Sequence, residues 1–116
     1  DITTGGADDL VKLTDAQLTA ELQVAAGGGT DTLEITTDAS VEDATLAGLG
    51  DLEVLRLAAD AGDGAQSVTL GAAALAAGLT TVDSSAAGGD DAVTVDATAF
   101  TAALQISGGA GDDVLL

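Results

Sequence analysis

Aspartate recurs at the end of short, glycine-rich phrases along this chain, each time two residues before an aliphatic side chain. The four positions are Asp9, Asp31, Asp91 and Asp113. Glycines in such phrases permit tight turns with positive φ and let backbone carbonyls point toward a common centre. Carboxylate and carbonyl oxygens together form a ligand set that suits Ca²⁺ better than Zn²⁺ or copper. The spacing therefore predicts calcium-binding turns, each followed by a β-strand.

We expect the metal ligands to come from these aspartates, from neighbouring acids and from the glycine carbonyls of the phrases. The candidate set is Asp9, Asp31, Asp91, Asp113, Gly6, Gly29, Gly89, Gly109, Gly111, Asp63 and Asp90. A fifth phrase has Gln66 in the ligand position, so it lacks the carboxylate and is expected to bind weakly or not at all. A single Asp-Gly phrase is also typical of an ordinary turn without metal. Five copies before five predicted strands favour the metal.

The charge of the chain limits its partners. Its 116 residues include 20 acids and 2 bases, a formal net charge of −18. Nucleic acids and anionic membrane surfaces attract basic patches, so neither is an expected partner, and no apolar run is long enough to insert into a membrane. Such a charge is typical of disordered chains, but 47% of the residues are hydrophobic, which favours a folded core. Divalent cations are the simplest way to neutralise the carboxylates of a compact fold.

Aliphatic residues at every second position follow the phrases and predict strands with one buried face. Four of these strands are expected at residues 10–13, 32–35, 67–70 and 92–95, and the fifth follows Asp113. Shorter apolar segments precede the phrases. Segments rich in Ala and Leu lie between the strands and are predicted to form single helical turns; they are residues 16–21, 41–49, 72–77 and 97–103.

The interval between phrases predicts the architecture. The aligned positions 9, 31, 66, 91 and 113 are 22, 35, 25 and 22 residues apart, and periods of 20 to 50 residues indicate repeat folds. The apolar residues are mostly small, with Phe100 the only aromatic, which suits a thin core. The predicted fold is all-β: a parallel β-solenoid (β-roll or β-helix) of about five rungs, with calcium on one edge and short helical turns on the other. Residues 46–57 alone also look like a leucine-rich repeat, which the other rungs do not keep.

The chain is predicted to be a single calcium-binding segment spanning residues 1–116. Ile2, Asp9 and Val11 match residues 106, 113 and 115 at a constant offset of 104. Either the chain is one unit of a longer tandem array, or neighbouring rungs simply resemble one another. Both readings are compatible with a fragment or repeat unit of a longer protein.

The residues 108–116 read GGAGDDVLL and match every position of the nonapeptide G-G-x-G-x-D-x-U-x, while residues 26–34 depart only at the first. On these motifs the chain resembles the RTX family, the haemolysin-type calcium-binding repeats. RTX β-rolls run nonapeptides back to back, whereas this chain has one phrase per 22 to 35 residues. That variant is similar to the calcium-binding β-solenoids of bacterial S-layer proteins and large surface adhesins.

The resemblance implies a structural, calcium-stabilised repeat domain of a secreted bacterial cell-surface protein, either an S-layer subunit or an adhesin or filament stalk. It also implies type I secretion and calcium-dependent folding outside the cell. The expected partners are calcium ions and either other copies of the chain or neighbouring repeats of the same protein. The alternative is an RTX secretion or folding segment of a larger secreted enzyme or toxin.

Catalysis by the chain itself is not expected. It contains no His or Cys, and its serines have no base to activate them. Paired carboxylates are available, but in this sequence they are better placed as metal ligands. A carbohydrate-binding module is a further possibility, although such modules usually present several exposed aromatic side chains, and this chain has only Phe100.

Overall fold

Short parallel strands form most of the structure, a computed structural model that describes residues 1–58, 64–88 and 92–116. The strands are β1 (Ile2–Thr3), β2 (Leu10–Leu13), β3 (Val24–Ala25), β4 (Thr32–Ile35), β5 (Ser40–Val41), β6 (Leu49–Gly50), β7 (Val54–Leu57), β8 (Gln66–Thr69), β9 (Thr81–Asp83), β10 (Val93–Asp96), β11 (Gln105–Ser107) and β12 (Val114–Leu115). One α-helix, α1 (Ala72–Ala77), and two 3-10 helices, η1 (Asp15–Gln17) and η2 (Asp43–Leu46), complete the described elements.

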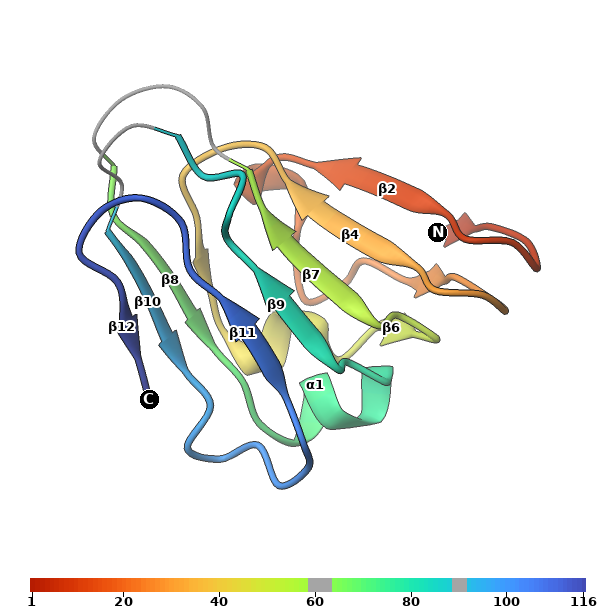
Figure 1. The fold of residues 1–116 in the computed structure, drawn as a ribbon. Helices are drawn as coiled ribbons and strands as arrows, with labels where there is room; N and C mark the ends of the chain where they lie inside the picture. Colours follow the sequence, from red (N-terminus) through yellow and green to blue (C-terminus); the bar gives the residue numbers. More distant parts are fainter. Residues whose placement is uncertain (59–63, 89–91) are drawn as a thin grey trace.

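The strands form three sheets (Figure 1). The largest has the order β11-β9-β7-β4-β2, the second β12-β10-β8-β5 and the smallest β1-β3-β6. Every strand pair is parallel, and paired strands belong to successive passes of the chain; Leu10, for example, lies opposite Thr32, which lies opposite Val54. The chain therefore crosses the five-stranded sheet once per pass, always in the same direction.

The core lies on the inner face of the five-stranded sheet. Aliphatic residues occupy every second position along its strands, and their side chains point into the core. Side chains of one register row point inward from its five strands: Val11, Leu33, Leu55, Val82 and Ile106. The three central members of this row are at most 1% exposed. Burial of one such side chain stabilises the folded state by about 1.5–3 kcal/mol. Val68 and Val95 cover the core from the four-stranded sheet.

Helix α1 is held by a residue from the preceding pass of the chain. The carboxylate of Asp43 accepts hydrogen bonds from the N–H groups of Gly71, Ala73 and Ala74, at 2.8, 3.0 and 2.9 Å. The first N–H groups of a helix have no partner within the helix, so a carboxylate satisfies them and also suits the helix dipole. At the other end Gly78 adopts φ +97, the left-handed conformation that commonly ends helices.

The predicted all-β solenoid of about five rungs, with short helical turns on one edge, is wrong. The structure is a small α/β-like arrangement in which successive passes contribute differently. The three-stranded sheet uses only strands between residues 2 and 50, and the four-stranded sheet only strands between residues 40 and 115. Among the described residues the three sheets remain separate and none closes. The Ala/Leu-rich segments differ as well, since residues 72–77 form an α-helix while residues 97–103 form none.

The solenoid prediction is wrong because the glycine-aspartate phrase marks a corner between two sheets but does not specify which two sheets meet there. The strands after the first two phrases, β2 and β4, belong to the five-stranded sheet. The strands after the last three, β8, β10 and β12, belong to the four-stranded sheet. Positions that look equivalent in sequence therefore occupy different places in the fold.

Candidate cation site

Two of the predicted calcium turns lie next to each other. Residues 4–9 and 26–31 connect the three-stranded sheet to the five-stranded sheet and precede β2 and β4. Residues 51–53 make the same connection before β7. We call these three stacked segments the acidic corner; in Figure 1 they lie at the right-hand ends of β2, β4 and β7.

Carboxylates at the acidic corner bond to the backbone of the neighbouring pass. The N–H of Asp9 donates to Oδ1 of Asp31 at 2.8 Å, and the N–H of Asp31 donates to Oε2 of Glu53 at 2.9 Å. In the opposite direction, the N–H of Thr30 donates to Oδ1 of Asp8 at 2.8 Å. Each acid therefore satisfies a backbone donor at the point where strand pairing begins.

Asp31 is the most deeply placed acid of this corner. Asp31 as a whole is only 1% exposed. Oδ1 accepts the hydrogen bond from Asp9, but Oδ2 is buried and has no hydrogen-bond partner among the described residues. A buried carboxylate oxygen without a donor is costly, because the protein must replace the water that it loses. The corner thus contains an unsatisfied acceptor of the kind that a cation or an ordered water would fill.

The two predicted glycine ligands of this corner have different environments. Gly29 has φ +123, and a Cβ atom there would lie 2.7 Å from the carbonyl oxygen of Ala7. The backbones of the two turns approach so closely that a side chain would not fit between them. Gly6, one pass earlier, has open space where its Cβ would be.

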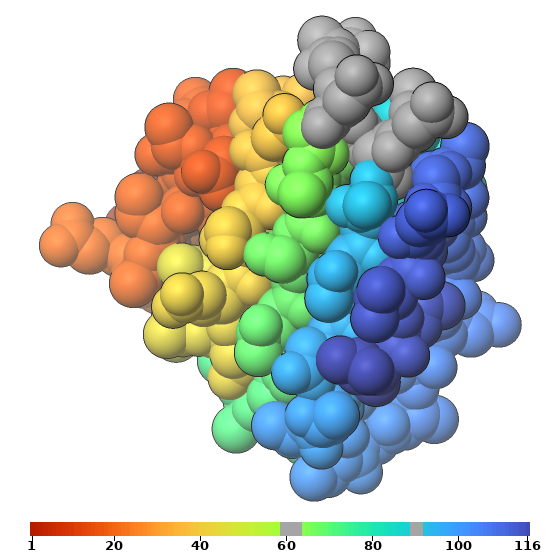
Figure 2. All heavy atoms as spheres, turned by 90° about the vertical axis from the view of Figure 1, so that its left-hand side faces the viewer, coloured from red at the N-terminus to blue at the C-terminus, as the bar shows by residue number. Residues whose placement is uncertain are grey.

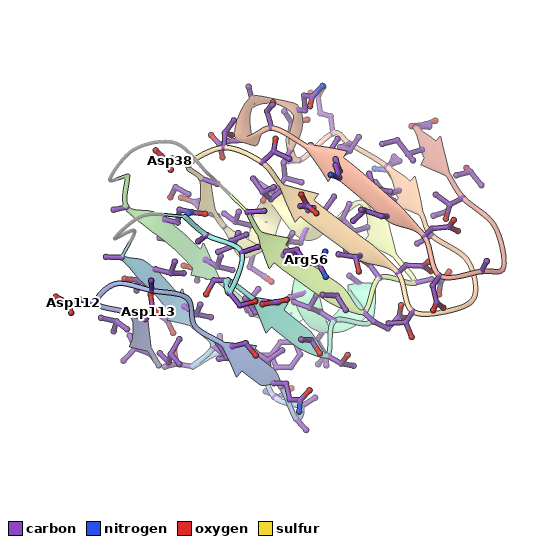
Figure 3. The ribbon with its side chains drawn as sticks, turned by 45° about the horizontal axis from the view of Figure 1, so that its top comes forward. Asp38, Arg56, Asp112 and Asp113 are labelled. Atoms are coloured by element: carbon purple, nitrogen blue, oxygen red, sulfur yellow. The ribbon has the colours of Figure 1, made fainter. Side chains whose placement is uncertain are left out.

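The last phrase lies at a second corner. Residues 108–113 follow the C-terminal end of β11 and lead into the four-stranded sheet, whereas the acidic corner precedes the N-terminal ends of β2, β4 and β7. Figure 3 shows Asp112 and Asp113 on this turn. Oδ1 of Asp113 accepts a hydrogen bond from the N–H of Val93 at 3.1 Å. Gly111 has φ +103, and a Cβ on Gly109 would lie 2.6 Å from the carbonyl oxygen of Ser84.

The candidate ligands therefore separate into two groups, in place of the single calcium edge that was predicted. The structure brings together Gly6, Asp9, Gly29 and Asp31 at the acidic corner, and Gly109, Gly111 and Asp113 at the second corner. Asp63, Gly89, Asp90 and Asp91 lie outside the described residues. Gln66, read as a degenerate ligand, is the first residue of β8 and is 1% exposed. Within residues 1–58, 64–88 and 92–116, no group of three or more acids is already arranged around a metal position.

Glu53 is a member of the acidic corner that the glycine-aspartate phrases did not predict. It lies 22 residues after Asp31, as Asp31 lies 22 residues after Asp9, and Thr32 pairs with Val54 in the same register. The signal was this repeated interval. The turn differs from the others because its residues 51–53 contain no glycine, and Gly48 and Gly50 come before it.

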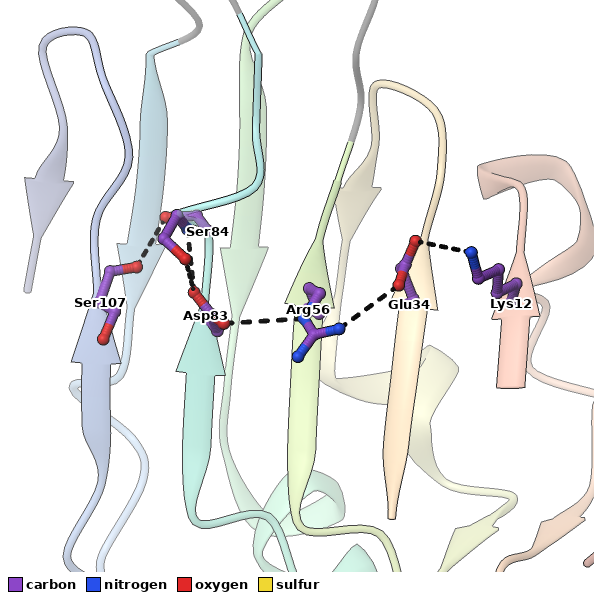
Figure 4. A network of polar contacts seen from close by, with 7 residues as sticks. Lys12, Glu34, Arg56, Asp83, Ser84 and Ser107 are labelled. Atoms are coloured by element: carbon purple, nitrogen blue, oxygen red, sulfur yellow. Dashed lines mark hydrogen bonds and ion pairs between the residues drawn. The ribbon is translucent and has the colours of Figure 1, made fainter. Parts of the chain in front are cut away.

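Both basic residues of the chain lie away from the acidic corner. They belong to one row on the outer face of the five-stranded sheet, shown in Figure 4, with each nitrogen–oxygen distance 3.6 Å: Lys12 to Glu34, Glu34 to Arg56, and Arg56 to Asp83. A hydrogen bond from the hydroxyl of Ser85, together with Arg56, lowers the pKa of Asp83. Neither base is therefore available to offset the charge of the acidic corner.

Comparison with protein-family models, curated proteins and solved structures found no match to the chain. The RTX-like motif thus remains an interpretation of the residues themselves. Within the part of the chain that the structure describes, no helix has the length and apolar character needed to cross a membrane.

Proposed function

We propose that this chain is a structural module, stabilised by calcium, of a secreted bacterial surface protein such as an S-layer subunit or an adhesin stalk. The observation that carries the proposal is the buried Oδ2 atom of Asp31, which has no hydrogen-bond partner in the part of the chain that the structure describes. Calcium would engage this oxygen, and the other ligands would come from turn carbonyls, neighbouring carboxylates and water, since Ca²⁺ accepts six to eight oxygen ligands in flexible geometry.

The charge of the chain supports a cation in this role. A net charge of −18 opposes compaction, and the two bases are already paired with Glu34 and Asp83 on the outer face of the largest sheet. A cation that binds the folded chain more tightly than the unfolded chain adds its binding free energy to the stability, about 2.7 kcal/mol at a free concentration 100 times the Kd. Calcium would in this way couple folding to the extracellular environment.

The test compares wild type with Asp31→Asn, a substitution of nearly the same shape that removes the charge. Thermal unfolding is followed by circular dichroism in EDTA and then with increasing CaCl₂. MgCl₂ at equal concentration and NaCl at equal ionic strength separate binding from charge screening. We expect calcium to raise the Tm of wild type well beyond the effect of NaCl, and this specific increase to be lost in Asp31→Asn.

Asp15→Asn is the matched control, because it removes the same charge from an exposed residue in η1, beyond the far end of β2. Its calcium response should equal that of wild type. In EDTA, Asp31→Asn should be at least as stable as wild type, since the amide can retain the bond from Asp9 while the unpaired charge is gone. A wild-type Tm that calcium does not change, or a full calcium response in Asp31→Asn, would contradict the proposal.

A further inference from the structure

We infer that the two edges of the five-stranded sheet, which pair with no further strand among the described residues, pair with each other between copies of the chain, so that copies join head to tail into open strings. The inference rests on the proposed structural role and names its partner, a second copy of the same chain. The edge strands are β2 at one end and β11 at the other.

The free hydrogen-bonding groups of β2 follow from the bonds it already makes. The N–H of Thr32 donates to the carbonyl of Asp9 at 2.8 Å, and the N–H of Thr36 donates to the carbonyl of Leu13 at 2.9 Å. Alternate residues of a strand direct their N–H and C=O groups to the same neighbour. The backbone groups of Leu10 and Lys12 therefore face the open edge.

The same reasoning applies to β11. The N–H of Gln105 donates to the carbonyl of Thr80 at 2.9 Å, and the carbonyl of Ser107 accepts from the N–H of Ser84 at 2.8 Å. Gln105 and Ser107 are thus turned toward β9. The N–H and C=O of Ile106, between them, face the open edge.

These two edges are complementary in one parallel register. With Ile106 opposite Val11 of a second copy, the N–H of Ile106 would reach the carbonyl of Leu10, and the N–H of Lys12 would reach the carbonyl of Ile106. This register also continues the inward row of aliphatic side chains, since Val11 begins that row and Ile106 ends it. Every pairing within the sheet is parallel, so the added pair repeats the existing geometry.

Of the five large apolar side chains that are exposed among the described residues, four lie on the first or last pass of the chain and the fifth, Leu75, lies on α1. Leu10 is 49% exposed on β2, and Val114, Leu115 and Leu116 are 46%, 47% and 59% exposed on and after β12, the edge strand of the four-stranded sheet. Figure 2 shows the first and last parts of the chain at opposite ends of the molecule. Association that covers these residues is favourable, because it removes apolar surface from water.

The charges at the edges are compatible with this contact. Charged side chains, especially Lys, commonly protect edge strands from pairing, and Lys12 lies on β2. Its ammonium group, however, is already 3.6 Å from Glu34. Strand β11 carries only Gln, Ile and Ser. In the proposed register Lys12 of the second copy would lie opposite Ser107, which itself lies opposite Asp83. The outer row of Figure 4 would then continue from one copy to the next.

The contact joins two different surfaces of the molecule, so each added copy leaves one edge of each kind free. Such heterologous contacts give open strings unless the rotation between copies closes a ring. The net charge of −18 opposes association, and high salt weakens that repulsion. We therefore expect strings to form in EDTA with high NaCl, without any divalent cation.

Sedimentation velocity over a wide range of protein concentration, with electron microscopy of the products, tests the inference. Lys12→Pro removes the N–H that faces the open edge and leaves the bonds to β4 in place. Lys12→Ala is its control, since it removes the charge alone. We expect wild type and Lys12→Ala to form strings that lengthen with concentration, and Lys12→Pro to stay monomeric with an unchanged far-ultraviolet spectrum.

Leu10→Asp is the second variant, in case Lys12→Pro does not fold. Leu10 is half exposed, so the change places a carboxylate at the contact without disturbing the core, and it should abolish string formation. A monomeric wild type at every salt and protein concentration, or association of both Lys12→Pro and Leu10→Asp like wild type, would overturn the inference. Association in EDTA reports on the edges alone, whereas the calcium shift of Tm reports on the proposed function, so either can fail separately.

Discussion

Asp31 donates its backbone N–H to the carboxylate of Glu53, 2.9 Å away, while its own carboxylate accepts the N–H of Asp9. The three residues are separated by 22 positions each and lie in successive passes of the chain. The carboxylates of Asp31 and Glu53 thus form a ladder that adds to the backbone bonds of the acidic corner, where the N–H of Glu53 also donates to the carbonyl of Asp31 at 3.2 Å. The two carboxylate oxygens of Asp31 therefore differ: Oδ1 accepts a hydrogen bond within the ladder, and Oδ2 has no partner among the described residues.

The ladder predicts that Glu53 contributes to stability in the absence of any metal. Glu53→Ala leaves the N–H of Asp31 without its acceptor, and loss of one partner from a buried hydrogen bond costs about 1–3 kcal/mol. Urea unfolding in EDTA measures the change. Glu21→Ala removes the same charge from an exposed position and should alter the unfolding free energy by less than about 0.5 kcal/mol, as is usual for surface substitutions. Equal effects of the two substitutions would contradict the role of the ladder.

Much of the local structure could be predicted from the sequence, because alternation of aliphatic side chains depends only on neighbouring residues. Strands at residues 10–13 and 32–35 occur where that alternation predicted them. Assignment of strands to sheets could not be predicted, since the turn phrase has the same chemistry at both corners. The burial of Gln66 also followed from the sheet that β8 joins, which the phrase does not specify.

The residues of the acidic corner could be predicted in part from the sequence, but their individual contacts could not. The sequence indicated Asp9 and Asp31 as acids of neighbouring turns, and the structure places them in contact. It could not indicate that only one oxygen of Asp31 would lack a partner, since that depends on how closely the turns approach. Asp43 had no local signal at all, because the helix that it caps begins almost thirty residues later.

The cap formed by Asp43 predicts a destabilising effect of Asp43→Ala. Replacement of a carboxylate that caps a helix N-terminus by Ala costs about 0.5–2 kcal/mol, and here three N–H groups would lose their acceptor. Glu42→Ala is the control, since the neighbouring side chain is exposed. Chemical denaturation should show a lower unfolding free energy for Asp43→Ala only. Near-equal values for the two variants would rule out a stabilising cap.

The same carboxyl group predicts a pH dependence. Partial burial raises the pKa of Asp43, but the hydrogen bonds from Ala74, Ala73 and Gly71 outweigh it, so the net pKa lies below the ordinary value. A group with a depressed folded-state pKa stabilises the fold above its unfolded pKa, and this contribution is lost as pH falls through the folded value. The stability difference between wild type and Asp43→Ala should be constant near neutral pH and shrink below about pH 4. A difference that is unchanged across that range would contradict this assignment.

The two glycines predicted as ligands at the acidic corner should respond differently to a methyl group. Gly29→Ala must place Cβ against the backbone of Ala7 while holding φ at +123, and strain of this kind costs about 1–3 kcal/mol. Gly6→Ala meets open space and should be close to neutral in stability. Thermal unfolding in EDTA should therefore show a lower Tm for Gly29→Ala alone. Because the strained turn carries Asp31, Gly29→Ala should also weaken the response to calcium, whereas Gly6→Ala should retain it. Equal Tm values for the two variants would mean that the close approach of the turns does not constrain the corner.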